Sequence, residues 1–396
     1  MLDGVRVLDL TQYLSGPACT LLMAGLGADV IKVEPTPGGD AARLLPVVRD
    51  ATSSYFIQQN RGKRSIAVDL RSDAGCVLVA ELAAECDVLI ENYGHGVLDK
   101  RGLGPDDLRA ANPSLIYASI SAYGRTGSKA ELPGFDLIAQ AYGGVAALTG
   151  EPESAPLGAG VPFADVSAGM MAFGAISSAL YGRTSTGEGQ FIDVSMVETV
   201  FNMHPFAMQG PSVTNEKARL RRTGRHFGAV PPAGTYRGPD GWIAMQVLDN
   251  QWSRLCDAAE SIDLGSMERF ATANGRADHR FELLELLESW MQGFDSDDAL
   301  VAHLEAHRIP AARVVDPAEA HLDPWFVEQG AITTVGDGDF GEVRVPGFPI
   351  RASGVARRDA EPPAPILGQH TDEVLTELLG WDDAQISAAR ATNVVV

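Results

Sequence analysis

Short β-branched runs alternate with small-residue amphipathic stretches along the first third of the chain. Strands are expected where Val, Ile and Leu gather, and helices where apolar residues recur at helical spacing between turn residues. The expected strands are Val5–Leu10, Asp29–Glu34, Ser65–Leu70, Asp87–Asn92 and Leu115–Ser121. The expected helices between them are Gly16–Gly27, Ser72–Glu85 and Pro105–Ala111. This alternation is typical of a Rossmann-like α/β fold with a parallel, doubly wound sheet.

The pattern changes twice in the rest of the chain. A helix, a strand and a second helix are expected at Ala164–Tyr181, Phe191–Met196 and Val197–Met208, and residues 215–241 then turn basic and rich in Gly and Pro, which indicates a linker and a mobile loop. Later signals are a strand at Trp242–Val247, helices at Gln251–Ala259, Arg280–Gln292 and Ser296–His307, strands near 311–315 and 342–350, and a helix at Thr371–Leu379. We therefore predict a large Rossmann-like domain in residues 1–205, a linker in 206–225, a smaller α+β domain in 226–315, and a linker with a return to the large domain in 316–396.

Composition excludes several classes of protein. The chain has 396 residues and a formal net charge of −21, which repels nucleic acid and anionic lipid. Its four cysteines form no CxxC pair and have no histidine at zinc spacing, so we expect no metal site and a reducing compartment. The N-terminus begins as a strand without a signal-peptide pattern, and no apolar stretch approaches the length of a membrane span. A cytoplasmic protein is expected.

The first strand-to-helix turn argues against a nicotinamide dehydrogenase. Its sequence, TQYLSGPACT, lacks the G-x-G-x-x-G phosphate loop, and no Walker A sequence occurs in the chain. The expected sheet is therefore Rossmann-like in shape without a dinucleotide signature, and shape alone does not give function.

Asp165 opens a helix of mostly small residues, PFADVSAGMMAFGAISSALYG. One interpretation is that this Asp is an ordinary N-cap. The other is that it is a nucleophile, because a helix N-terminus keeps a carboxylate ionised and offers N–H groups to developing negative charge. The small neighbours Ser167, Ala168 and Gly169 leave room for a bulky substrate.

Two loops follow expected parallel strands, where doubly wound folds bind ligands. They are Tyr13–Pro17, and the ENYGHG segment in which Asn92 can donate hydrogen bonds and Tyr93 can stack on a base. The alternative for both loops is a simple turn.

Basic residues gather in NRGKRS, residues 60–65, and again at Lys100 and Arg101. They are candidates for phosphate binding, with solvated surface charge as the alternative. The segment PGFDLIAQAYGG indicates a helix that begins near Phe135 and Asp136, with Gln140 one turn further on.

Six segments taken in order resemble the class III CoA-transferase family, which includes formyl-CoA transferase, carnitine CoA-transferase and α-methylacyl-CoA racemase. They are RVLDLTQYLSGPACTLLMAGLGADVIKVEPTPGGD, NRGKRSIAVDL, DVLIENYGHGVLDKRGL, PGFDLIAQAYGG, FADVSAGM and TGEGQFIDVSM, and the tail LGQHTDEVLTELLG extends the similarity over nearly the whole chain.

The resemblance implies an interlocked homodimer, and acyl-CoA and carboxylic acid substrates with no permanently bound cofactor. Asp165 falls at the family's nucleophilic aspartate. The resemblance places the following residues at CoA: Leu14 and Ser15 in the first loop, and Asn92, Tyr93, Val97 and Lys100 or Arg101 around its adenine and phosphates. It places Phe135 and Asp136 in the segment that lines the acyl site.

The chain also departs from the family pattern. Pro35 stands where some relatives carry a CoA-contacting Arg, so that contact is in doubt here. The glycine-run loop of formyl-CoA transferases is replaced by RHFGAVPPAG, which weakens the case for an oxalate-type substrate. The basic residues Arg221, Arg222 and Arg225 are candidates for binding an acceptor dicarboxylate, with a mobile basic loop as the alternative.

Phe135 decides between the two chemistries of the family. A racemase needs a proton-carrying partner for the Asp, and the family's racemases have a His at the position of Phe135. We therefore favour a CoA-transferase that forms aspartyl mixed-anhydride and aspartyl-CoA intermediates at Asp165. A racemase or epimerase and a non-catalytic CoA-binding relative are the alternatives.

Overall fold

The computed structural model describes the chain except for residues 47, 50–51, 228–230, 338–340 and 355–359. The described residues divide into two compact units. The larger unit consists of Met1–Val145, Ala159–Pro205 and Pro324–Val396, and the smaller of Ala146–Gly158 and Phe206–Asp323.

The larger unit is built on a six-stranded sheet whose strand pairs are all parallel. Its order is β5-β2-β1-β6-β7-β8, so successive strands are added to one side of β1 and then, from β6 on, to its other side. The strands are β1 (Arg6–Asp9), β2 (Asp29–Pro35), β5 (Arg64–Val68), β6 (Val88–Glu91), β7 (Ile116–Ser121) and β8 (Phe191–Ser195). The expected parallel, doubly wound α/β fold is confirmed.

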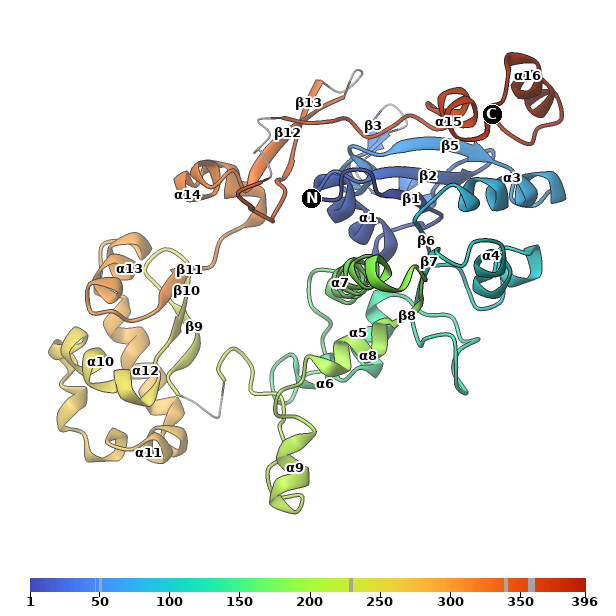
Figure 1. Ribbon diagram of the computed structural model, residues 1–396. Coiled ribbons are helices and arrows are strands. Elements are labelled where there is room, and N and C mark those ends of the chain that lie inside the picture. Colours follow the sequence, from blue (N-terminus) through green and yellow to red (C-terminus); the bar gives the residue numbers. More distant parts are fainter. Residues whose placement is uncertain (47, 50–51, 228–230, 338–340, 355–359) are drawn as a thin grey trace. The chain divides into compact units, whose positions relative to one another are not determined.

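Alternating side chains of these strands form two cores, one on each face of the sheet. In β1, for example, Leu8 joins one core and Val7 the other. Figure 1 shows the two helical layers. One core includes residues of α3 (Asp73–Ala84), α4 (Pro105–Ala111), α15 (Thr371–Leu379) and α16 (Asp383–Ala391), and the other includes residues of α1 (Ser15–Gly25), α5 (Asp136–Tyr142), α7 (Phe163–Thr186) and α8 (Met196–Asn202).

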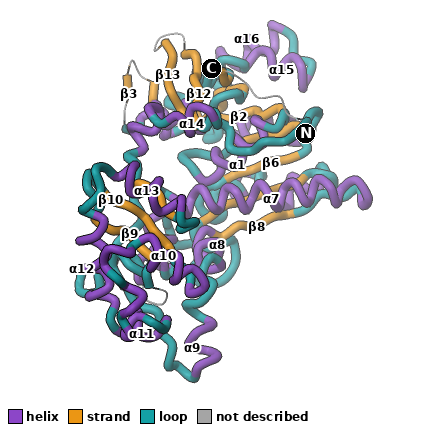
Figure 2. Tube along the Cα trace, turned by 90° about the vertical axis from the view of Figure 1, so that its left-hand side faces the viewer, coloured by secondary structure: helices purple, strands orange, loops and turns teal. Residues whose placement is uncertain are grey.

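The small residues of α7 allow close packing against α1. A Cβ atom on Gly169 would lie 2.4 Å from the Ser15 carbonyl oxygen, so only glycine fits there. Figure 2 shows α7 running alongside β8. With a mean hydropathy of 1.3 over an 18-residue window, α7 is the one described helix long and apolar enough to cross a membrane by length and composition. The expectation that no stretch approaches this length was therefore wrong, although a helix packed on a soluble core passes the same test.

The helix expected at Val197–Met208 is shorter than predicted. The strand ends at Ser195, whose hydroxyl accepts a hydrogen bond from the Glu198 N–H at 3.2 Å and caps α8 at its N-terminus. The helix ends at Asn202, three residues before Pro205, because a proline within a helix removes a backbone hydrogen bond and clashes with the preceding turn.

The smaller unit has an antiparallel sheet in the order β11-β10-β9, packed against helices. The expected α+β character is confirmed. Residues 233–237, expected to be part of a linker and loop, instead form β9, and residues 228–230 of that segment lie outside the described residues. The elements are β9 (Ala233–Arg237), β10 (Trp242–Gln246), β11 (Ala311–Arg313), α10 (Trp252–Ala258), α11 (Ala273–Asp278), α12 (Arg280–Met291) and α13 (Asp297–Ala306).

The remaining elements are short. They are α2 (Ser54–Asn60), α6 (Val145–Leu148), α9 (Gln209–Thr214), α14 (Pro324–Glu328), a hairpin of β3 (Val48–Arg49) and β4 (Thr52–Ser53), and a sheet of β12 (Ile332–Asp337), β13 (Gly341–Pro346) and β14 (Ala360–Glu361).

Candidate active site

A cavity of about 460 Å³ opens at the carboxyl ends of β1, β6 and β7, where the strand order of the sheet reverses. This is the position at which doubly wound folds bind ligands, and the volume suits a substantial part of a cofactor-sized molecule. Its wall includes Gln12, Tyr13 and Ser15 after β1, Asn92, Tyr93, Gly94 and His95 after β6, Ser121 and Ala122 at the end of β7, and Tyr55, Phe135, Asp165 and Met196 from other elements.

Asp165 lies in the first turn of α7 and reaches this cavity. It does not cap the helix, as one interpretation of the sequence held. Pro162 occupies the N-cap position, and the free N–H groups are bound by a residue from α5. Oδ1 of Asp136 accepts hydrogen bonds from the backbone N–H groups of Ala164, at 2.8 Å, and Asp165, at 3.3 Å. The Asp165 carboxyl group is thus not used for capping and lies at the cavity wall.

Gln140 extends this arrangement from within α5. Its side chain is only 1% exposed, and its Nε2 donates to Oδ2 of Asp136 at 2.6 Å. Its Oε1 accepts a hydrogen bond from the Ala159 N–H at 2.8 Å. Asp136 and Gln140 together fix the start of α7, and with it the position of Asp165.

The pKa of Asp165 is raised from 3.8 to about 7. Burial is the largest cause and the nearby charge of Asp136 is the second, while a hydrogen bond with the Ser15 side chain opposes them. The helix start alone therefore does not hold the pKa of this carboxyl group in its usual range. The helix dipole is a modest effect, and it is outweighed here by desolvation and by a second carboxylate. The result is a cavity-lining carboxyl group whose pKa lies near neutral pH.

Buried charges hold the loop after β1. Nζ of Lys32 donates to the Thr11 carbonyl oxygen at 2.8 Å and pairs with Asp40 at 2.9 Å. Oδ1 of Asp40 accepts the Tyr13 N–H at 3.1 Å, and Tyr13 has a φ of 61°, which is unusual for a residue other than glycine. The conformation that brings Ser15 to Asp165 thus depends on ionic contacts beneath the loop.

The basic cluster at residues 60–65 is not solvated surface charge, because its cations contact carboxylates and carbonyl oxygens within the protein. Lys63 is 3% exposed, and its Nζ contacts Oδ2 of Asp9 at 3.1 Å and Oγ1 of Thr20 at 2.7 Å. Burial lowers the pKa of Lys63 to about 8 against the opposing effect of Asp9. Arg61 donates to the Pro346 carbonyl oxygen at 3.0 Å, and Arg64 pairs with Asp29 at 2.5 Å. These cations stabilise the fold.

The loop after β6 meets the loop after β1 through Asn92. Its Oδ1 accepts the Gln12 N–H at 2.8 Å, and its Nδ2 donates to the Gln12 carbonyl oxygen at 2.7 Å and to Oγ of Ser15 at 3.2 Å. Asn92, Tyr93 and Ser15 therefore line one cavity, as parallel strand ends predict. The described cavity wall does not include four other residues expected at CoA: Leu14, which is 3% exposed, and Val97, Lys100 and Arg101, which follow in the same turn as Tyr93.

Phe135 and Asp136 are neighbours in the sequence but have different surroundings. Phe135 is 67% exposed, lines the cavity, and meets the Tyr13 ring edge to face at 6.2 Å between centroids. Asp136 is instead occupied with the start of α7. Sequence reasoning missed Tyr55, which also lines the cavity and whose pKa is raised by burial and then by the charge of Asp165. The only local feature that could have pointed to Tyr55 is its position two residues after Ser53, which caps α2.

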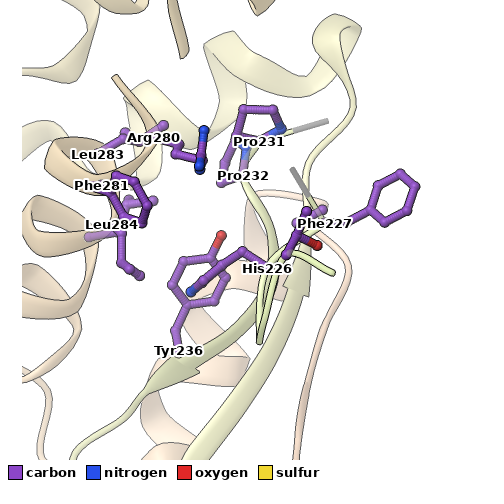
Figure 3. A pocket seen from close by; sticks show the side chains of 12 residues that line it. His226, Phe227, Pro231, Pro232, Tyr236, Arg280, Phe281, Leu283 and Leu284 are labelled. Atoms are coloured by element: carbon purple, nitrogen blue, oxygen red, sulfur yellow. The ribbon is translucent and has the colours of Figure 1, made fainter. Parts of the chain in front are cut away.

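A second, much smaller pocket lies within the smaller unit (Figure 3). Its accessible volume of about 40 Å³ holds little more than a water molecule, so it does not compete as a substrate site. Nearby, Arg225 pairs with Glu288, and Arg222 donates to the carbonyl oxygens of Glu151 and Ser154. Arg221 is exposed. Among the described residues, no group of His, Cys, Asp and Glu side chains is arranged to hold a metal ion.

A parallel sheet with a carboxyl group of raised pKa in a cavity at its switch point is the arrangement expected of an α/β enzyme. The chain belongs to CoA-transferase family III, whose sequence pattern matches residues 2–371. It is 32% identical to succinyl-CoA:glutarate CoA-transferase of Homo sapiens over 100% of this chain and 90% of that protein. It is 34% identical to succinyl-CoA–D-citramalate CoA-transferase of Chloroflexus aurantiacus over 100% of this chain and 98% of that protein.

A solved structure agrees with these relatives. The crystal structure of a CAIB/BAIF family protein from Brucella suis superimposes with a TM-score of 0.84 at 35% identity, covering 95% of this chain and 99% of that chain. The resemblance inferred from the ordered motifs is confirmed, and the chain is a class III CoA-transferase that moves CoA from an acyl-CoA thioester to a carboxylic acid.

Proposed function

We propose that Asp165 is the covalent nucleophile of this CoA-transferase. The observation that carries the proposal is its position: a carboxyl group in the first turn of α7, at the wall of a 460 Å³ cavity, with its own N–H bound by a neighbouring carboxylate. A carboxylate of raised pKa is also a better nucleophile than an ordinary one once it has lost its proton.

The proposed reaction proceeds through two kinds of intermediate. A carboxylate oxygen of Asp165 attacks the thioester carbonyl carbon, and the carbon–sulfur bond breaks to give a mixed anhydride and CoA thiolate. The thiolate attacks the aspartyl carbonyl carbon, which forms an aspartyl-CoA thioester and releases the donor acid. The acceptor carboxylate attacks this thioester and expels the CoA thiolate, which leaves a mixed anhydride of the acceptor and Asp165. The thiolate then attacks the acceptor acyl carbon, forms the new acyl-CoA and frees Asp165.

We propose that Leu14 and Ser15 form the first CoA-binding loop, and that Asn92 and Tyr93 bind the adenine and phosphate part of CoA. Their support is the shared cavity, together with the hydrogen bond from Asn92 to Ser15. Val97, Lys100 and Arg101 would then meet the adenine and phosphates beyond the cavity wall, because they follow in the same turn.

For the acyl site, we propose that Phe135 contacts the acyl group and that Asp136 acts through α7. We further propose succinyl-CoA as donor and a short dicarboxylic acid as acceptor. The support is that relatives matched over the whole chain carry succinyl-CoA and glutarate or D-citramalate in their names.

The test is a matrix of acyl-CoA donors and carboxylic acid acceptors, read by mass spectrometry of the CoA products. Replacing Asp165 by Ala should lower exchange on the order of 10³-fold or more, because no other group replaces a covalent nucleophile. Hydroxylamine added with the donor should label Asp165 of the wild type. The matched control is Asp107→Ala, which removes an exposed first-turn carboxylate from α4 and should leave exchange unchanged.

Two results would contradict the mechanism. One is undiminished transfer in the Asp165→Ala variant. The other is deuterium uptake at the α-carbon of a 2-methylacyl-CoA in the absence of an acceptor, which would indicate racemisation instead.

We also propose that the active form is an interlocked homodimer. Its support is the number of large apolar side chains exposed on one side of the larger unit, more than an isolated soluble chain needs. On α5 and α7 they are Leu137, Ile138, Tyr142, Met170 and Met171, each at least 43% exposed. Sedimentation equilibrium should give twice the chain mass at micromolar concentration, and a monomer would contradict the proposal.

A cytoplasmic location is the last part of the proposal. It is supported by four unpaired cysteines, Cys19, Cys76, Cys86 and Cys256, since free thiols are typical of reducing compartments. Cell fractionation would test it, and recovery in a membrane pellet would contradict it.

A further inference from the structure

Arg125 lies in the loop after β7 and is held there by its own backbone. Its N–H donates to Oδ2 of Asp193, on β8, at 2.8 Å. Its side chain is only 10% exposed and runs back toward the neighbouring loop after β6. A nearly buried guanidinium in a connecting loop needs partners, because an unpaired buried cation is costly.

The partners of Arg125 are two carboxylates that lie on either side of one turn. Nη1 lies 3.2 Å from Oε1 of Glu91, the last residue of β6. Nη2 lies 2.8 Å and 2.6 Å from the two oxygens of Asp99, the first residue of the short helix Asp99–Arg101. The turn between these two anchors, residues 92–98, contains Asn92, Tyr93 and Val97. We call residues 92–98 the CoA turn.

The anchors act on the turn directly. The second oxygen of Glu91, Oε2, accepts the N–H of Tyr93 at 2.7 Å. Asp99 immediately precedes Lys100 and Arg101. Between the anchors, Gly94 and Gly96 give the backbone unusual freedom, and Gly96 has a φ of 72°. A flexible turn held at both ends loses less entropy when it closes on a ligand.

Arg125 also neutralises the turn. Without it, Glu91, which is 1% exposed, would be left beside Asp99 with no described cation in contact, and the two carboxylates would repel. Both would then stand beside a site that has to accept the phosphates of CoA. The described cavity wall includes neither Arg125 nor Asp99, so neither is expected to touch the thioester.

We propose that Arg125 is a positioning residue for CoA: by bridging Glu91 and Asp99 it holds the CoA turn in the conformation that receives the nucleotide part of the substrate. This inference rests on the proposed placement of CoA at this turn. It assigns Arg125 no part in the chemistry at Asp165.

The test compares two substrates that carry the same acyl group. Succinyl-CoA contains the nucleotide, and succinyl-pantetheine lacks it. In the variant Arg125→Lys, which keeps the charge and loses the two-pronged geometry, we expect KM for succinyl-CoA to rise about 3- to 10-fold with kcat nearly unchanged. We expect kcat/KM for succinyl-pantetheine to stay at the wild-type value. Asp99→Asn, a milder change at a half-exposed site, should give the same selective effect if Arg125→Lys fails to fold.

The matched control is Arg183→Lys. Arg183, in the last turn of α7, is similarly buried and pairs at 2.7 Å with Asp87, which precedes the amino end of β6, and neither residue lines the cavity. Equal losses for both substrates in either test variant would overturn the inference, and so would an unchanged KM for succinyl-CoA in both. Failure of the proposed function is a separate result, because wild-type enzyme would then neither transfer CoA nor bind it in a calorimeter.

Discussion

Replacing Asp165 by Asn should stabilise the protein, and by more at alkaline than at acidic pH. A carboxyl group whose pKa is raised on folding binds its proton more tightly in the folded state. Such a group therefore does not lower the free energy of unfolding at a pH below its unfolded pKa. The free energy of unfolding falls as the pH rises from the unfolded pKa toward the folded pKa. The window for Asp165 runs from 3.8 to about 7.

The size of the effect follows from these two values. A raise from 3.8 to about 7 corresponds to a full penalty of about 4 kcal/mol, reached above pH 7, and to about 2 kcal/mol at pH 5. Asn keeps the shape of the side chain and removes the charge. The free energy of unfolding of Asp165→Asn minus that of the wild type should therefore increase by about 2 to 3 kcal/mol between pH 5 and pH 8.

Urea unfolding at fixed protein concentration, followed by circular dichroism at both pH values, measures this difference. Glu81→Gln, which removes an exposed carboxylate from α3, is the control and should show no such trend. A difference that is flat with pH, or that shrinks at pH 8, would refute the conclusion that Asp165 is held against its preferred ionisation. A positive result would mean that the fold keeps this carboxylate in the cavity at the expense of stability.

Two other substitutions test the packing beneath the site. Lys63→Met leaves the carboxylate of Asp9 buried without its nearest cation, so the free energy of unfolding should fall by about 3 to 5 kcal/mol in urea titrations, and a loss below 1 kcal/mol would contradict the buried pair. Gly169→Ala places a Cβ 2.4 Å from the Ser15 carbonyl oxygen and should cost about 1 to 3 kcal/mol and lower kcat. Gly174→Ala, in the same helix with no atom within 4 Å of the new Cβ, should be neutral or stabilising by up to about 1 kcal/mol, and equal losses at both glycines would refute the packing argument.

The local sequence determined most of the secondary structure and the fold class. Hydrophobic runs and turn residues act over a few neighbours, so β1, α1, β2 and the helix that carries Asp165 were predicted close to their observed positions. Errors came where one side chain set a boundary, as at Ser195, which ends a strand and caps the next helix. The order of six motifs also identified the family, because order and spacing survive changes at single positions.

Only the tertiary structure decided the electrostatics of the site. The residues next to Lys63 in the sequence do not show whether its side chain is exposed or buried. Its pairing with the buried Asp9 could therefore not be predicted. The cap of α7 comes from Asp136, 28 residues earlier, and a local pattern suggested that Asp165 caps its own helix. Its pKa then depends on burial and on that same distant carboxylate. The sequence by itself thus singled out Asp165 as the candidate nucleophile, whereas long-range packing decided the pKa of its carboxyl group, because desolvation and charge–charge contacts exist only once the chain has folded.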